Sequence, residues 1–248
     1  LVVLDCTVFL RMGDNGFISE SGRQNWADGH IPGAGFADLN EDLVDASSRL
    51  RYALPAAREF ADAMQRLGVS DDSRVVLYDD NRAMWAARVW WMLRWIGFDN
   101  AALLDGGLQA WKAEDRLVTT ASEAPVEGTL TVHERPQIIA DKADVLAAID
   151  DGSTCLIDAL SPASFSGEVN AYGRPGHIPG ASNASATALL DDETGCYLPA
   201  AELRNRFPDD PSARIVNYCG GGIAASSAAF VQTMLGFHDV AVYTASLQ

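Results

Sequence analysis

The chain of 248 residues is poor in cysteine, and this shortage excludes two kinds of site. Its four cysteines form no Cys-x-x-Cys pair and have no histidine at metal-ligand spacing, so no zinc or other metal site is expected. Four cysteines in a chain this long do not make a disulfide framework either. We therefore expect a reduced, cytoplasmic protein. The four are Cys6, Cys155, Cys196 and Cys219.

Positive charge and long apolar runs are also scarce. Only 18 Lys and Arg stand against 34 Asp and Glu, and the formal net charge is -16. Because a phosphate backbone repels such a chain, nucleic acid is not expected as a partner. The longest apolar stretch, residues 85–96, is broken by Arg88 and Arg94 and is shorter than the about 18–20 residues that cross a bilayer. No membrane partner is expected.

What the sequence does contain is an internal repeat. The hexapeptide Gly-His-Ile-Pro-Gly-Ala occurs at residues 29–34 and again at 176–181. The two copies start 147 residues apart. A spacing this long indicates two tandem domains, since solenoid repeats run about 20–50 residues. Four further pairs follow in the same order along the chain: 3–5 with 156–158, 74–78 with 214–218, 96–98 with 235–237, and 108–109 with 247–248.

Each copy alternates short Val, Ile and Leu runs with helical stretches. This alternation predicts an α/β protein with two tandem domains, each a mainly parallel sheet flanked by helices. The polar, proline-containing stretch 121–137 is predicted to link a first domain, 1–120, to a second, 138–248, and its centre, 129–132, is a candidate short strand. Strands are expected at 75–78, 101–104, 215–218 and 240–243, and helices at 55–67, 83–96 and 223–235.

The most reactive residue is expected directly after strand 215–218. Cys219 is followed by Gly220-Gly221-Gly222-Ile223-Ala224 and then by a helix. Three glycines let several backbone amides converge on one point, and the positive end of the helix points there as well. A cysteine in such a loop is expected to react as the thiolate. The alternative is a small buried cysteine before an ordinary glycine loop.

These motifs, with Leu-Asp-Gly-Gly-Leu-Gln-Ala-Trp at 104–111 and Arg-Val-Trp-Trp at 88–91, resemble the two-domain rhodanese family over essentially the whole chain. That family contains the thiosulfate and 3-mercaptopyruvate sulfurtransferases. The resemblance implies that Cys219 carries a persulfide and that the first domain is inactive, because Asp79 stands at the matching position. The residues after Asp79 include no glycine, so we expect no converging amides there.

The resemblance also implies the substrates. A small anionic donor (thiosulfate or 3-mercaptopyruvate) gives up a sulfur, and a thiophilic acceptor such as cyanide, a thiol or a reduced protein dithiol removes it. No metal, nucleotide or organic cofactor is implied.

Substrate binding is expected to involve the amides of Gly220, Gly221, Gly222, Ile223 and Ala224. The family's two substrate arginines align with Leu160 and Ser164, so both are missing here. Arg174 is the nearest replacement in sequence, and its alternative is a solvated surface charge. His30 matches a family position that faces the active cleft, and for His30 as for His177 the alternative is a ring that caps a turn.

Two other functions fit parts of the pattern. A phosphatase of this fold needs Cys-x5-Arg, but the arginine position is occupied by Ala225, so the bidentate clamp for a phosphoryl group is absent. A non-catalytic binding or regulatory module is the second alternative. The missing arginines favour it, and the presence of Cys219 opposes it.

Overall fold

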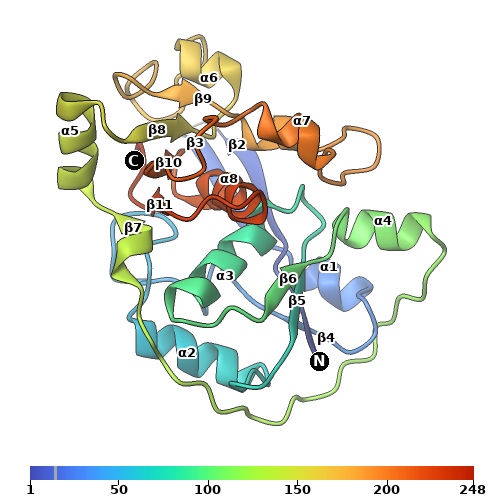
Figure 1. Ribbon diagram of the computed structural model, residues 1–248. Coiled ribbons are helices and arrows are strands. Elements are labelled where there is room, and N and C mark those ends of the chain that lie inside the picture. The colour runs from blue at the N-terminus through green and yellow to red at the C-terminus, as the bar shows by residue number, and fades with distance from the viewer. Residues whose placement is uncertain (14–15) are drawn as a thin grey trace. The chain divides into compact units, whose positions relative to one another are not determined.

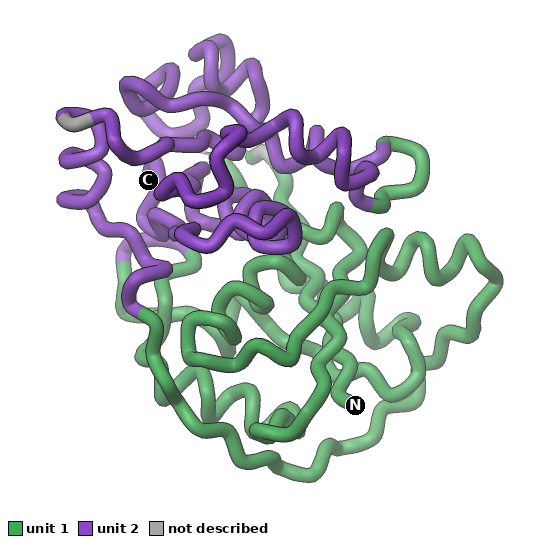
Figure 2. Tube along the Cα trace, viewed as in Figure 1, with its two compact units in different colours: residues 1–48, 52–135, 192–196 green, residues 49–51, 136–191, 197–248 purple. Residues whose placement is uncertain are grey.

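The computed structural model describes residues 1–13 and 16–248 of the chain. The chain groups into two compact units, shown in Figure 2. Unit 1 consists of residues 1–48, 52–135 and 192–196, and unit 2 of residues 49–51, 136–191 and 197–248. Each unit is built on a parallel sheet with helices packed around it (Figure 1). The predicted fold class is therefore confirmed.

The sheet of unit 1 has the strand order β4-β1-β5-β6, and all neighbours run parallel. Its central strands are rich in Val and Leu, as expected for strands covered on both faces. Asp5 and Tyr78 lie opposite each other in the register, at the carboxyl ends of β1 and β5. The strands are β1 (Val2–Asp5), β4 (Ala34–Phe36), β5 (Val75–Tyr78) and β6 (Ala101–Leu103), and an antiparallel pair, β2 (Val8–Gly13) and β3 (Gly16–Ser21), stands apart.

Helix α3 (Met84–Trp95) fills the core of unit 1. It is buried along nearly its whole length, because apolar residues make up all of it except Arg88 and Arg94. Trp85 and Trp91 are among the largest fully buried side chains. The helix starts after Ala83, which has a left-handed φ of 58°, and Gly97 follows its end with φ 93°. The remaining helices of unit 1 are α1 (Arg23–Asp28), α2 (Ala57–Arg66) and α4 (Gly107–Ala113).

The end of the predicted linker is fastened to unit 1. Residues 128–135, which we call the strap, run along it without forming the candidate strand. The amide of Gly128 donates to the carbonyl of Gln65 at 2.8 Å. Further along, the amide of His133 donates to the carbonyl of Ile96, also at 2.8 Å. The strap therefore belongs to the fold of unit 1.

The sheet of unit 2 repeats the order of unit 1 and adds one edge strand. Its order is β7-β11-β10-β8-β9, again parallel throughout. The strands are β7 (Ile139–Ala140), β8 (Cys155–Asp158), β9 (Ser182–Asn183), β10 (Ile215–Tyr218) and β11 (Val240–Tyr243). The helices are η1 (Pro136–Ile138), α5 (Lys142–Asp151), α6 (Pro162–Ser166), η2 (Ala186–Leu189), α7 (Ala200–Arg204) and α8 (Ile223–Met234). The central position of β10 places the residue after it at the middle of the sheet edge.

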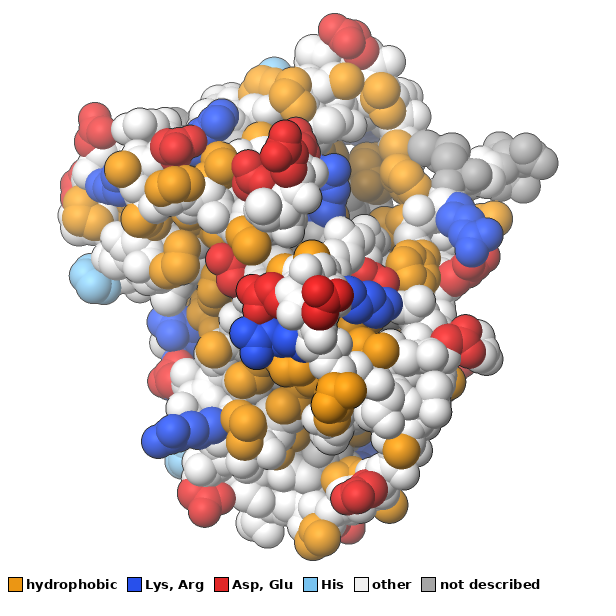
Figure 3. Space-filling model, turned by 90° about the vertical axis from the view of Figure 1, so that its right-hand side faces the viewer, with side chains coloured by type: hydrophobic (Ala, Val, Ile, Leu, Met, Phe, Trp, Pro, Cys, Tyr) orange, Lys and Arg blue, Asp and Glu red, His pale blue; other side chains and the backbone are white. Residues whose placement is uncertain are grey.

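The surface agrees with the composition. On the face shown in Figure 3, acidic and basic side chains are scattered among apolar ones, and the described residues of that face make no broad basic patch. Within the part of the chain that the structure describes, no helix combines the length and the apolar character needed to cross a membrane.

Candidate active site

The central strand of unit 2 leads directly to Cys219. All four residues of β10 are buried, and the chain then turns through three glycines into α8. Gly222 precedes the helix with φ 82°, a left-handed conformation that glycine adopts at little cost. The turn leaves Cys219 only 2% exposed at the N-terminal end of a 12-residue helix.

Two groups lie against the sulfur of Cys219. The amide of Gly222 donates a hydrogen bond to Sγ at 3.1 Å, and Oγ of Ser246 lies 4.0 Å from the same sulfur. Ser246 Oγ also accepts the amide of Cys219 at 3.0 Å and donates to the carbonyl of Tyr243 at 2.9 Å. An N–H that points at sulfur stabilises negative charge there. The geometry thus fixes the cysteine by its backbone and supports charge on its side chain.

Ser246 is a site residue that the sequence analysis missed, although the repeat contained the signal. The match of 108–109 with 247–248 places Ser246 opposite Gly107 of the first copy. Both residues are left-handed, with φ 54° and 55°. The amides that follow them, of Leu247 and Leu108, donate at 3.2 Å to the carbonyls of Cys219 and Asp79.

The first copy holds a carboxylate where the second holds the thiol. Two amides, of Asn81 and Ala83, donate to Asp79 Oδ1 at 2.8 and 2.9 Å. Those of Trp85 and Ala86 donate to Oδ2 at 3.0 and 2.9 Å. We call such a set of converging amides a cradle. The prediction that no cradle forms here was wrong, because Arg82 and Ala83 take the left-handed conformation, with φ 61° and 58°, without being glycine.

Comparison with known proteins agrees with this geometry. The rhodanese-like domain matches the chain twice, over residues 10–114 and 141–248. The chain belongs to the rhodanese family. A 3-mercaptopyruvate sulfurtransferase of Escherichia coli (strain K12) is 34% identical, with 94% of this chain and 84% of that protein aligned. The human 3-mercaptopyruvate sulfurtransferase is 31% identical over 92% of this chain and 79% of its own length.

A solved structure extends the likeness to three dimensions. The crystal structure of the 3-mercaptopyruvate sulfotransferase SseA from Escherichia coli matches with a TM-score of 0.87 and 31% sequence identity. The match covers 100% of this chain and 92% of that chain. This rhodanese is thus an enzyme of the sulfurtransferase class, and the non-catalytic alternative is set aside.

The hexapeptide repeat of this rhodanese ties a loop to the sheet in each unit. In unit 2 the amide of Ile178 donates to the hydroxyl of Tyr218 at 3.0 Å, and Tyr218 lies opposite Asp158 in the register. In unit 1 the amide of Ile31 donates to the hydroxyl of Tyr78 at 3.3 Å. Burial raises the pKa of both tyrosines, so they remain neutral phenols. The motif therefore anchors loops at the strand ends.

Both repeat histidines make structural contacts. The ring of His177 stacks on Phe165 at 3.7 Å, and its Nδ1 lies 2.8 Å from the carbonyl of that residue. His30, predicted to bind substrate, is fully buried in unit 1. Its two ring nitrogens lie 2.7 and 3.2 Å from the carbonyls of Trp26 and Ala121. These are the contacts of the turn-capping alternative, and they occupy both nitrogens of the His30 ring.

The segment in which the family resemblance places two arginines lies in unit 2. The amide of Leu160 donates to Asp158 at 2.8 Å, and Ser164 belongs to α6, where its Oγ lies 3.0 Å from Ser161 Oγ. Arg174 is exposed in the loop that follows. From the same loop, Tyr172 packs on Gly220 of the cysteine loop. That contact joins two segments far apart in sequence, so the sequence analysis did not find it.

The other cysteines are set apart from this chemistry. All four are free, but Cys6 is completely buried. That burial, together with the charges of Asp5 and Asp79, raises the pKa of the Cys6 thiol well above its usual range. Cys155 belongs to β8, and Cys196 lies in the segment 192–196 of unit 1. Among the four, Cys219 alone sits at the N-terminal end of a helix.

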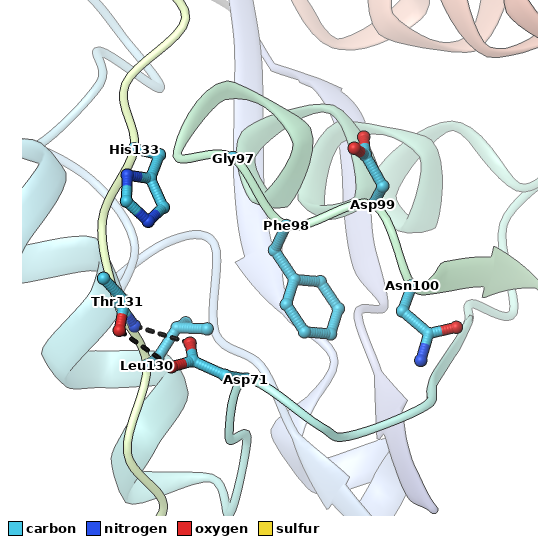
Figure 4. A pocket seen from close by; sticks show the side chains of 8 residues that line it. All are labelled: Asp71, Gly97, Phe98, Asp99, Asn100, Leu130, Thr131 and His133. Carbon is cyan, nitrogen blue, oxygen red and sulfur yellow. Dashed lines mark hydrogen bonds between the residues drawn. The ribbon is translucent and has the colours of Figure 1, made fainter.

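A pocket elsewhere in unit 1 belongs to the fold. Figure 4 shows it between the strap and the end of α3, with Asp71, Asp99 and His133 among its lining residues. Asp71 accepts hydrogen bonds from both the amide and the hydroxyl of Thr131 at 2.7 Å. Those bonds lower the pKa of Asp71. Its carboxylate therefore fastens the strap and is not poised as an acid or base.

Proposed function

We propose that this enzyme moves a sulfane sulfur from an anionic donor, through a persulfide on Cys219, to a thiophilic acceptor. The observation that carries the proposal is the thiol of Cys219, which ends the central strand and accepts the amide of Gly222 at the start of α8. The names of the relatives support 3-mercaptopyruvate as donor, and thiosulfate is the second donor. We place the reaction in the cytoplasm, where free thiols stay reduced.

In the first step the thiolate of Cys219 attacks the outer sulfur of the donor. With thiosulfate the S–S bond breaks, sulfite leaves with the electron pair, and Cys219 becomes Cys–S–S⁻. With 3-mercaptopyruvate the C–S bond breaks, and the carbon that keeps the electron pair takes up the proton of the donor thiol, which gives pyruvate. Covalent catalysis of this kind divides one difficult transfer into two easier ones.

The cradle of the first copy supports an assignment of the groups that hold the persulfide. Cγ of Asp79 and Sγ of Cys219 are both attached to Cβ. The carboxylate oxygens of Asp79 therefore lie where the outer sulfur of a Cys219 persulfide would lie, one bond further out. Aligned on the left-handed residue before each helix, Ala83 corresponds to Gly222. On this alignment the amides of Trp85 and Ala86 correspond to those of Ala224 and Ala225. We assign the charge of the outer sulfur to the amides of Ala224 and Ala225, which act as an oxyanion hole does for oxygen, while the amide of Gly222 stays on Sγ.

In the second step the acceptor attacks the outer sulfur. Cyanide leaves as thiocyanate, a thiol becomes a persulfide, and a dithiol goes on to displace sulfide as it forms a disulfide. Each route returns Cys219 as the thiolate. Arg174 is proposed to attract the anionic donor from its exposed position in the loop after α6.

The persulfide is tested by mass. When the reduced enzyme meets 3-mercaptopyruvate or thiosulfate without acceptor, the peptide that contains Cys219 should gain about 32 Da, one sulfur atom. Cys219→Ser should reduce turnover by at least about a hundredfold, since a serine hydroxyl does not form the anion at neutral pH.

Cys155→Ser is the matched control, because Cys155 is also a free cysteine of unit 2 but lies at the opposite end of its strand. It should keep full activity. Added mass on Cys155, or sulfur transfer by the Cys219→Ser variant, would show that the reactive residue has been misassigned.

A further inference from the structure

Gly220, the first residue after the reactive cysteine, lies directly against an aromatic side chain. A Cβ built on Gly220 would overlap the phenol of Tyr172, and the three nearest atoms are all from that ring and its hydroxyl. Gly220 is absent from the left-handed residues of the backbone. Its lack of a side chain therefore serves to make room for Tyr172 and is not required by the chain conformation.

The loop that carries Tyr172 is closed at its base. It leaves α6 at Gly167 and returns at Gly176, and a Cβ at Gly167 would lie 3.1 Å from the amide nitrogen of Gly176. Just beyond the base, His177 stacks on Phe165 of α6. Gly173, directly after Tyr172, is left-handed with φ 83°. The two ends of the loop are therefore held together by the Gly167–Gly176 and Phe165–His177 contacts, and between them Tyr172 packs against the cysteine loop.

The sulfur of Cys219 is covered by its surroundings. Cys219 is 2% exposed, so a donor has to approach past the side chains that cover its loop. The two positions where the family resemblance places arginines are Leu160 and Ser164, and both precede the Tyr172 loop on the same segment. A phenol is a hydrogen-bond donor that needs no counter-charge.

We propose that Tyr172 is a substrate-binding residue whose hydroxyl donates a hydrogen bond to the oxyanion group of the sulfur donor as the donor enters above Gly220. The inference rests on the proposed sulfur transfer. The shared chemistry of the ligand is a small carboxylate or an inorganic sulfur oxyanion next to the transferable sulfur. In this enzyme a neutral phenol packed against the cysteine loop takes over part of the role that the family resemblance assigns to guanidinium groups.

The hydroxyl is tested by Tyr172→Phe, which keeps the ring and removes the donor group. The KM for 3-mercaptopyruvate and for thiosulfate should rise about ten- to a hundredfold, with kcat changed less than about twofold, as for one lost hydrogen bond to a charged group in binding. The rate at which iodoacetamide alkylates Cys219 should stay the same, because the ring still covers the loop. Tyr197→Phe is the control, since Tyr197 is also half-buried in unit 2 but its hydroxyl lies 3.4 Å from Ser227.

The position of the ring is tested by a double-mutant cycle. Tyr172→Ala should speed alkylation of Cys219 by uncovering it, and Gly220→Ala should do the same by pushing the phenol away. The combined variant should be no faster than Tyr172→Ala alone, because the ring that the added methyl group would displace is already gone. Alkylation does not require turnover, so this cycle is independent of the donor.

The outcomes separate the two proposals. An unchanged KM for both donors in Tyr172→Phe overturns the role of the hydroxyl, and additive effects of Gly220→Ala and Tyr172→Ala overturn the contact itself. If the unaltered enzyme gains no sulfur from either donor while the alkylation cycle behaves as expected, the proposed sulfur transfer fails and the contact of Tyr172 stands.

Discussion

At the scale of single residues, the two copies of the repeat carry different acidic groups directly after a central strand. In unit 1 the group is the carboxyl of Asp79: burial raises its pKa, and four amides that donate to it partly offset the effect. In unit 2 the group is the thiol of Cys219, which accepts the amide of Gly222 and which we propose as the sulfur carrier. On the proposed function, the identity of this one residue separates a structural loop from a reactive one.

The carboxylate of Asp5 provides a prediction at the same scale. Burial raises its pKa to about 6 from the ordinary 3.8, although hydrogen bonds from Thr7 and Tyr78 partly offset the effect. The folded state therefore holds this proton more tightly than the unfolded chain. The stability from this group is fully present below about pH 4 and is lost as the pH rises through 6, up to about 3 kcal/mol.

In the variant Asp5→Asn the side chain is neutral at every pH, so the variant should not lose this stability as the pH rises. The difference in unfolding free energy between wild type and variant should change between about pH 4 and pH 7 by that amount. Tryptophan fluorescence in urea measures it, because all six tryptophans belong to unit 1. A constant Asp5→Asn difference across this range would refute the assignment.

At the scale of elements, local patterns predicted most of the fold. The strands expected at 75–78, 215–218 and 240–243 form with those bounds, and the helices end within two residues of the expected positions. Such elements follow from runs of Val, Ile and Leu and from glycine at helix ends. The reactive cysteine was predictable for the same reason, since strand, glycines and helix are neighbours in sequence.

What the sequence did not predict depends on contacts between distant segments. Tyr172 precedes Gly220 by almost fifty residues, and no periodicity relates them. Arg82 and Ala83 are left-handed without being glycine, so composition gave no sign of the Asp79 cradle. The strap has no strand pattern because its hydrogen bonds go to helix ends and loops of unit 1. Propensity describes residues and their neighbours, whereas these features arise from tertiary packing.

The strap offers a prediction at this scale. A Cβ at Gly128 would overlap the carbonyl of Val69, so Gly128→Ala has to lift the strap from unit 1. The variant should lose about 1–3 kcal/mol of unfolding free energy, measured by tryptophan fluorescence in urea. Gly29→Ala is the control, because nothing lies within 4 Å of that Cβ and φ is 169°, and it should change stability by less than about 0.5 kcal/mol. Equal losses in both variants would mean that the strap contact is unimportant.

At the scale of the whole molecule, net charge opposes the substrate. The chain carries a formal charge of -16, and both proposed donors are anions. Salt shortens the range of this repulsion from about 30 Å at 0.01 M to about 8 Å at 0.15 M. Between about 0.01 and 0.15 M salt, kcat/KM should therefore rise, and it should rise more for the doubly charged thiosulfate than for the singly charged 3-mercaptopyruvate. Steady-state rates in sodium chloride measure the effect, and a fall with salt would indicate that local positive charge, such as Arg174, dominates.

The hydrogen bond between a strand-end tyrosine and the isoleucine of the hexapeptide occurs in both units, and it has a consequence for how this protein can evolve. In both units a tyrosine hydroxyl joins the sheet edge to the amide of the isoleucine in the hexapeptide. This connection holds the scaffold whether the loop beside it carries a carboxylate or a thiol. A copy can thus gain or lose its reactive group while its architecture persists.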